Sequence, residues 1–300
     1  MVKGTRGIVK KETKKERAIR IYSHFSIVSD GEKILAPGFG WITPLLKDGN
    51  KKTGKEVKTF SLLPSDKVFK LDIDGKEYTV KGTCGQTCKN EKTGTCTCYA
   101  MHGFTAMYDS RKVQLINTVL VRSNIIFVYN AICAQIIIEN VSEVRIHAAG
   151  DFDTCNGPTL YPTVWKMIIK RFPGVRFWTY TKYKECEGLF DGFENAGIVR
   201  SILPDESYNY GTASEVIEKY NALVNAGEIV HICGCGTPSE RRCHDCAGCS
   251  KYKYTLFLKH SCNDYKPGVD DPEEYAAFCE LVKTQKYQDE TFNTITMAAD

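Results

Sequence analysis

A cluster of five cysteines in the last quarter of the chain carries the clearest chemical signal in the 300-residue sequence. Three of the cysteines follow one another as Cys-x2-Cys-x2-Cys, and two more precede that run. Such a run brings three thiolates into one tight loop. Iron–sulfur clusters are bound by three cysteines in such a run together with a fourth thiolate from elsewhere in the chain. The spacing favours a [4Fe–4S] cluster, and zinc as Zn2+ is the alternative because it accepts the same ligands. The predicted ligands are Cys243, Cys246 and Cys249, with Cys235 or Cys233 as the fourth.

A second group of four cysteines lies within fifteen residues in a stretch rich in Gly, Thr and Lys. Its members are Cys84, Cys88, Cys96 and Cys98. Their density predicts a metal site, either separate or shared with the later cluster. The spacing Cys84-x3-Cys88 also begins the motif of radical S-adenosylmethionine enzymes, but that motif needs a third cysteine where this chain has Glu91. S-adenosylmethionine therefore remains a possible cofactor that the motif does not support.

The interpretation of the fourteen cysteines depends on whether the protein is cytoplasmic or secreted. Apolar residues make up 42% and charged residues 25%, which excludes a disordered chain. No apolar run follows the basic N-terminal residues, so we expect no secretory signal there. The most apolar stretch, residues 125–138, is interrupted by Asn130 and Gln135 and predicts no membrane span. We therefore expect a cytoplasmic protein, in which clustered cysteines favour metal over disulfide.

A polar strand and the loop that follows it form the second chemical signal. In a predicted strand over residues 143–148, alternation places Arg145 and His147 on one face. Basic side chains on a buried face need hydrogen-bonding or charged partners, or they have a functional role. Asp151 and Asp153 come directly after the strand, where catalytic residues collect in parallel α/β folds.

Two interpretations of this segment stay open. In the first, His147, Asp151 and Asp153 form an acid–base or substrate-binding group, and Arg145 binds a cofactor. In the second, Arg145 and Asp151 form a structural ion pair, while Asp153 caps the next helix.

Lys182 occupies a corresponding place after the predicted strand 175–181. A lysine there can bind an anionic group of a substrate, or it can be an ordinary loop lysine. Charged residues at several strand ends together predict a polar rim around one pocket, which is why Lys182 is counted with the candidate catalytic residues.

The elements that must position these residues follow a regular spacing. Predicted strands begin near residues 143, 175, 198, 228 and 254, every 23 to 32 residues, with helices over 161–171 and 213–223. This is the spacing of βα units. The predicted fold class is α/β: a parallel βα-repeat sheet that forms a complete or partial TIM-like barrel with Cys-rich metal-binding loops. An open, doubly wound sheet is the alternative.

The chain is expected to divide into three parts. Residues 1–20 form a basic N-terminal tail, residues 21–82 a β-rich or loop region with a hairpin over 69–80, and residues 83–300 the metal-binding βα domain. The tail carries a charge of +6 against +4 for the whole chain. It is either a solvated tail, which we favour, or an arm that binds nucleic acid.

Several of these strings resemble the phage "gene product 88" family. The resemblance rests on VRIHAAGDFDT from residue 144, Trp165, FPGVRFWTYTK from residue 172, Cys98-Tyr99-Ala100 and the later Cys-rich loop. It covers roughly residues 80 to 255, and departs from the family where Cys-Gly replaces Cys-Pro at Cys84 and Cys235. It implies a phage or mobile-element origin, hence the cytoplasm of a bacterial host, and no settled activity.

The sequence thus predicts a [4Fe–4S] enzyme that acts by radical or redox chemistry on a nucleotide or nucleic acid. A non-redox form is base exchange by an Asp151 nucleophile, with zinc holding the loops. The alternative from another class is a non-enzymatic phage protein with structural zinc or iron–sulfur that binds nucleic acid or a host protein. No membrane partner is expected.

Overall fold

The computed structural model of the chain describes residues 12–49, 54–85, 98–101, 103–153, 160–186, 188–202, 213–228, 230–232, 254–256, 272–273 and 275–284. Within these ranges, no helix combines the length and the apolar character needed to cross a membrane.

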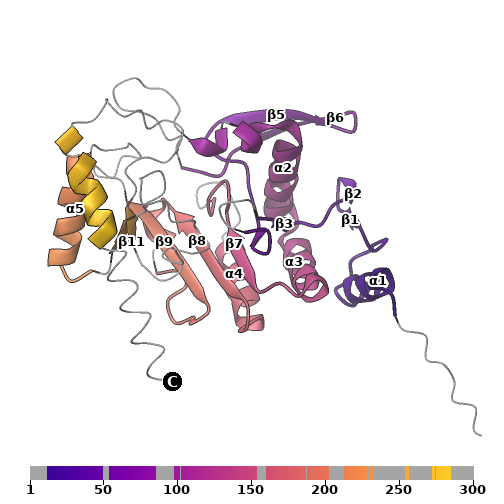
Figure 1. Ribbon diagram of the computed structural model, residues 1–300. Coiled ribbons are helices and arrows are strands. Elements are labelled where there is room, and N and C mark those ends of the chain that lie inside the picture. Colours follow the sequence, from indigo (N-terminus) through magenta and orange to yellow (C-terminus); the bar gives the residue numbers. More distant parts are fainter. Residues whose placement is uncertain are drawn as a thin grey trace, which may run out of the picture.

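The described part is organised around a seven-stranded sheet in the order β10-β11-β9-β8-β7-β4-β3 (Figure 1). The strands are β3 (Lys47–Asp48), β4 (Lys58–Thr59), β7 (Glu143–Ile146), β8 (Arg176–Thr181), β9 (Ala196–Ile202), β10 (Val230–Ile232) and β11 (Tyr254–Leu256). Neighbours from β10 to β4 run parallel, and β3 pairs antiparallel with β4. The sheet is therefore mixed and open.

The prediction of a parallel βα-repeat barrel is wrong. The two edge strands, β10 and β3, do not pair with each other, so the described sheet does not close. The connections also differ from a βα repeat. Only a short 3₁₀ turn, η3 (Lys184–Cys186), lies in the described part of the β8–β9 connection. The chain between β4 and β7 instead contains a separate hairpin and two helices.

The elements between β4 and β7 match local sequence patterns. The hairpin consists of β5 (Val68–Ile73) and β6 (Lys76–Lys81), joined at Asp74 and Gly75, which both have positive φ. Helices α2 (Tyr108–Ser123) and α3 (Ile125–Glu139) follow. Helix α3 is apolar on most of its faces because α1 (Lys14–His24), α2 and α4 (Leu160–Arg171) all contact it.

Part of the predicted basic tail is a packed helix. Helix α1 (Lys14–His24) begins at a capping box in which Thr13 and Glu16 bond each other's backbone N–H. Its buried side chains Ile21 and Tyr22 join the main core, and Arg17 donates to the carbonyl of Ile137 in α3. The hairpin of β1 (Ile34–Ala36) and β2 (Gly40–Ile42) comes next.

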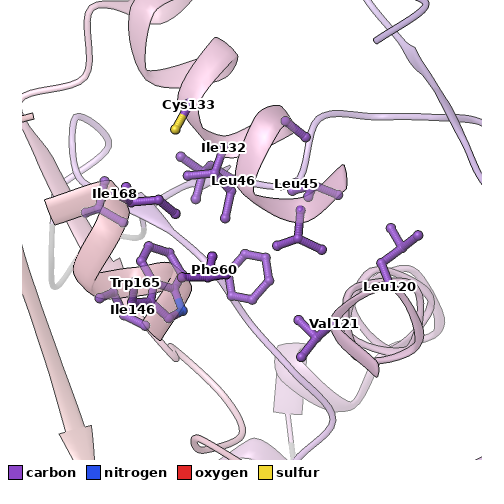
Figure 2. Packing of buried hydrophobic residues seen from close by; sticks show 14 of the residues in the cluster. Leu45, Leu46, Phe60, Leu120, Val121, Ile132, Cys133, Ile146, Trp165 and Ile168 are labelled. Atoms are coloured by element: carbon purple, nitrogen blue, oxygen red, sulfur yellow. The ribbon is translucent and has the colours of Figure 1, made fainter. Parts of the chain in front are cut away.

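The main core lies between the sheet and helices α3 and α4 (Figure 2). Trp165 of α4 meets Phe60 edge-on, with 5.6 Å between ring centroids. Gln135 is buried in α3, where its side-chain amide bonds both the N–H and the C=O of Leu46. This explains how a polar residue is accommodated in the apolar run. A second, smaller core joins α5 (Ala213–Asn225), β10, β11 and the helical residues 275–284.

Candidate functional site

The loop from His147 to Asp153 leaves the carboxyl end of β7 in an unusual backbone conformation. His147, Gly150 and Asp153 all have positive φ, at 60°, 80° and 54°. A positive φ is uncommon outside glycine, even for His and Asp, which adopt it more often than most residues, and such conformations concentrate at functional sites. Because β7 ends at Ile146, the predicted alternation stops before His147.

Arg145 and His147 consequently have different surroundings. The Arg145 guanidinium lies over the rings of Trp178 and Tyr180 in β8, 5.2 and 5.6 Å from their centroids. His147 bonds Tyr161 of α4 instead. The role of Arg145 in cofactor binding stays a prediction, because nothing in the described geometry tests it.

The Asp151 carboxylate is the best-connected group of the loop. Its Oδ1 accepts from the Thr181 hydroxyl at 2.8 Å and from the Phe152 backbone N–H at 2.8 Å. Its Oδ2 accepts from the Lys182 backbone N–H at 2.9 Å. The predicted ion pair between Arg145 and Asp151 is not formed, because the Arg145 guanidinium lies over the Trp178 and Tyr180 rings instead.

Asp151 remains easy to protonate despite these donors. The residue is 5% exposed, and burial raises the pKa of its carboxyl to about 6, while the bonds from Lys182 and Thr181 act in the opposite direction. A carboxyl with a pKa near neutrality can both take up and release a proton under physiological conditions.

His147 is buried and neutral. It is 3% exposed, and burial lowers the pKa of its imidazole to about 3. Its Nε2 lies 2.6 Å from the Tyr161 hydroxyl, and the edge of Phe152 packs 4.6 Å from its ring centroid. Among the described residues, Nδ1 has no hydrogen-bond partner. His147 is therefore a polar group enclosed next to Asp151.

Asp153 fixes the far end of the loop. Its Oδ2 pairs with Nε of Arg122 in α2 at 2.7 Å. The same guanidinium donates to the carbonyls of Lys81 and Gly82 at 2.8 and 3.3 Å. The predicted helix cap is not observed, because α4 begins only at Leu160. Asp153 instead ties the loop to the end of β6.

Thr83 is a member of the site that the sequence analysis missed. Its hydroxyl accepts from the Asp151 N–H at 3.0 Å and donates to the Leu63 carbonyl at 2.8 Å. Its own carbonyl accepts from the Tyr183 hydroxyl at 2.9 Å. The one available signal was its position immediately before Cys84.

The two ends of the first cysteine group reach this loop. Cys84 directly follows Thr83, and its N–H donates to the Ser65 carbonyl at 3.1 Å. Cys98 is buried in a small cluster with Ala100 and Ala149, which lies two residues before Asp151. Cys84 and Cys98 are thus both attached to the Asp151 loop through neighbouring residues.

The other predicted ligands lie outside the described residues: Cys88, Cys96, Cys233, Cys235, Cys243, Cys246 and Cys249. In the part of the chain that the structure describes, no group of three or more His, Cys, Asp or Glu side chains is arranged to hold a metal ion. The metal centre therefore stays a prediction. Lys182 contributes its backbone N–H to Asp151, and its predicted binding of an anion stays a prediction.

Fold and site together define a mixed α/β protein with a buried carboxylate where two parallel strands end. The profile of the gene product 88 family matches residues 44–202, just over half of the chain. The chain belongs to this family of phage gene products, and the predicted resemblance is confirmed. The match includes Thr83, Asp151 and Thr181. No curated protein and no solved structure matches the chain.

Gly150 should be the least replaceable residue of the loop. A Cβ at this position would lie 2.7 Å from both Leu62 Cβ and Thr83 Oγ1. Gly192 has a similar φ of +86°, and a Cβ there would have no atom within 4 Å. Gly192→Ala therefore measures the cost of the left-handed backbone alone, about 1–2 kcal/mol of unfolding free energy. We expect Gly150→Ala to cost about 1–3 kcal/mol more, because it also overpacks the loop. Urea unfolding measures both, and equal losses would show that the loop tolerates a side chain.

The two buried titrating groups should give opposite pH dependences of stability. The pKa of Asp151 rises from 3.8 to about 6 on folding, so the folded state binds its proton more tightly and the unfolding free energy falls as pH rises from about 4 to 6. The pKa of His147 falls from 6.5 to about 3, so the unfolding free energy rises between these values. Each group changes the unfolding free energy by up to about 1.4 kcal/mol per pH unit.

Substitution separates the two contributions. Between pH 4 and 6, we expect the unfolding free energy of Asp151→Asn to rise more steeply with pH than that of the wild type. That of His147→Gln should fall relative to the wild type over the same range. Urea titrations at several pH values measure these slopes. Curves that run parallel to the wild type would mean that neither pKa is displaced in the folded protein.

Proposed function

We propose that this protein is a phage metalloenzyme that holds a Cys-ligated centre, a [4Fe–4S] cluster, beside Asp151 and acts on a nucleotide or nucleic acid. The observation that carries the proposal is that both ends of the first cysteine group are attached to the Asp151 loop. Cys84 follows Thr83, whose hydroxyl accepts from the Asp151 N–H, and Cys98 packs with Ala149 of the same loop.

The donor set fits such a centre. Cys84 and Cys98 would supply two thiolates, and the remaining thiolates would come from the cysteines outside the described residues. Iron–sulfur clusters and zinc both require thiolate ligands that stay reduced, which the cytoplasm of a bacterial host provides. When bound, a [4Fe–4S] cluster supplies one-electron chemistry, whereas zinc supplies structural support or Lewis acidity.

The role of Asp151 in this proposal is to take up and release a proton. Its Oδ1 accepts two hydrogen bonds and its Oδ2 accepts one, so Oδ2 keeps a lone pair that can take up a proton while all three donors stay in place. The raised pKa suits this proton transfer to neutral pH.

The substrate class rests on charge. Lys182 follows β8 next to the Asp151 carboxylate, and a lysine at a strand end is suited to a phosphate group. Tyr180, which is half-buried, and the Arg145 guanidinium over its ring lie on the same pair of strands, and aromatic and guanidinium groups stack on nucleobases. A nucleotide or a nucleic acid offers both a phosphate and a base.

Metal and sulfide analysis of the anaerobically purified full chain tests the proposal. We expect about four irons and four sulfides per chain and a broad absorption band near ~400 nm. Cys84→Ser and Cys98→Ser should lose most of the iron and the band. The matched control is Cys279→Ser, in the helical residues 275–284, which should retain both.

Two outcomes would contradict the proposal. A colourless protein with zinc in place of iron would favour the structural-metal alternative. Iron and sulfide that persist in both serine variants would place the centre away from Asp151.

A further inference from the structure

The hairpin of β1 and β2 presents a row of apolar side chains to solvent. Leu35 of β1 pairs with Trp41 of β2, and the Leu35 N–H donates to the Val28 carbonyl at 2.9 Å, so the three side chains lie next to one another. Successive side chains alternate between the two faces, and the neighbours Ile34 and Ile42 belong to the main core. Val28, Leu35 and Trp41 are 59%, 42% and 48% exposed. The hairpin therefore buries one apolar face and exposes another.

Trp41 sets this row apart from scattered apolar residues on the surface. The other two tryptophans of the chain, Trp165 and Trp178, are buried. Phe39, two residues before Trp41, stacks on Tyr78 of β6, with 5.0 Å between the ring centroids and 21° between the ring planes. A contiguous apolar patch on a protein surface marks an interaction site. An exposed aromatic ring within it is a platform on which an unpaired base can stack.

Lysines flank Trp41 in both directions along β2. On one side, the hydroxyl of Thr43, two residues after Trp41, accepts a hydrogen bond from the ammonium group of Lys47. On the other side, Lys76 Nζ lies 5.0 Å from the centroid of Tyr78, the ring that stacks two residues before Trp41. Ammonium groups on either side of an exposed ring match the phosphates that precede and follow each base of a nucleic-acid strand.

The excess positive charge of the chain is concentrated around this hairpin. Residues 1–49 carry ten Lys or Arg and five Asp or Glu, a charge of +5, whereas the whole chain carries +4 and residues 50–300 therefore −1. Helix α1 holds four of the ten and lies beside the hairpin, because a Cβ on Gly31 would lie 2.6 Å from Lys15 Cγ (Figure 1). A polyanion is therefore attracted to this end of the molecule.

We propose that the Trp41 surface, formed by Val28, Leu35 and Trp41 with the flanking Lys47 and Lys76, binds single-stranded nucleic acid. An unpaired base stacks on Trp41, and the neighbouring phosphates lie next to the lysines. A duplex fits less well, because its bases stack on one another and hide their faces. A second copy of the chain would bring the same positive charges together, which disfavours self-association through this face. The proposal uses no property of the metal centre.

The test measures binding of the full chain to a fluorescein-labelled oligothymidylate of about 16 nucleotides by fluorescence anisotropy. We expect Trp41→Ala to weaken binding roughly five- to a hundredfold, because stacking is lost, and Trp41→Phe to lie closer to the wild type. Lys76→Gln should weaken binding at low salt and reduce the salt dependence. The matched control is Val224→Ala, in α5 at the opposite end of the described part (Figure 1), which is 44% exposed and should bind like the wild type.

Tryptophan emission gives a second readout that a merely structural role would not change. Because the other two tryptophans are buried, the unlabelled oligonucleotide should quench the emission of the wild type and leave that of Trp41→Ala unchanged. Urea unfolding of each variant shows that it is folded.

Three results would overturn the proposal. The first is an oligonucleotide that does not bind, and the second is equal affinity for the wild type and Trp41→Ala. The third is a duplex of the same length that binds as tightly as the single strand, because charge alone would then explain the binding. Sedimentation that shows self-association, abolished in Trp41→Ala, would also overturn it and make this face a contact between copies. Failure here leaves the metal analysis of Cys84→Ser and Cys98→Ser as a separate test of the proposed function.

Discussion

The carboxylate of Asp151 accepts a hydrogen bond from each of three groups, and the rest of the site is arranged around these bonds. Two of the donors, the Thr181 hydroxyl and the Lys182 N–H, belong to the end of β8. The third is the N–H of Phe152, within the loop that follows β7. Because β7 and β8 are parallel neighbours, their carboxyl ends lie side by side, and one buried carboxylate can join them. Without these donors, a carboxylate at this depth would be too costly to ionise.

The same constraint explains the neighbouring residues. Thr83 receives the Asp151 N–H and connects the loop to the Leu63 carbonyl, so the segment that carries Cys84 is fixed relative to the carboxylate. Gly150 is needed because its Cα passes too close to Leu62 and Thr83 for a side chain. The positive φ of His147 is maintained because Tyr161 and Phe152 enclose its ring. The loop is therefore fixed by hydrogen bonds and packing on both sides of Asp151.

Local patterns in the sequence predicted individual elements well and their connections poorly. The hairpin near residues 69–80 and the helix over 161–171 follow from alternation and helical periodicity, which are local properties. The barrel was wrong because strand spacing alone does not reveal whether a helix separates two strands, and β8 is followed by the short turn η3. Asp151 was found because it follows a strand, whereas Thr83 was missed because 68 residues separate it from the carboxylate that it supports.

The central claim is that Asp151 is a buried carboxyl that exchanges its proton near neutral pH. The most direct test is a pH titration of the carboxyl carbon of Asp151 by ¹³C NMR, with the resonance assigned by its absence in Asp151→Asn. The account predicts a midpoint of about 6, well above the ordinary aspartate value of 3.8. A midpoint at or below 3.8 would contradict it, because the carboxylate would then be a permanently ionised structural anchor and not a proton-transferring group.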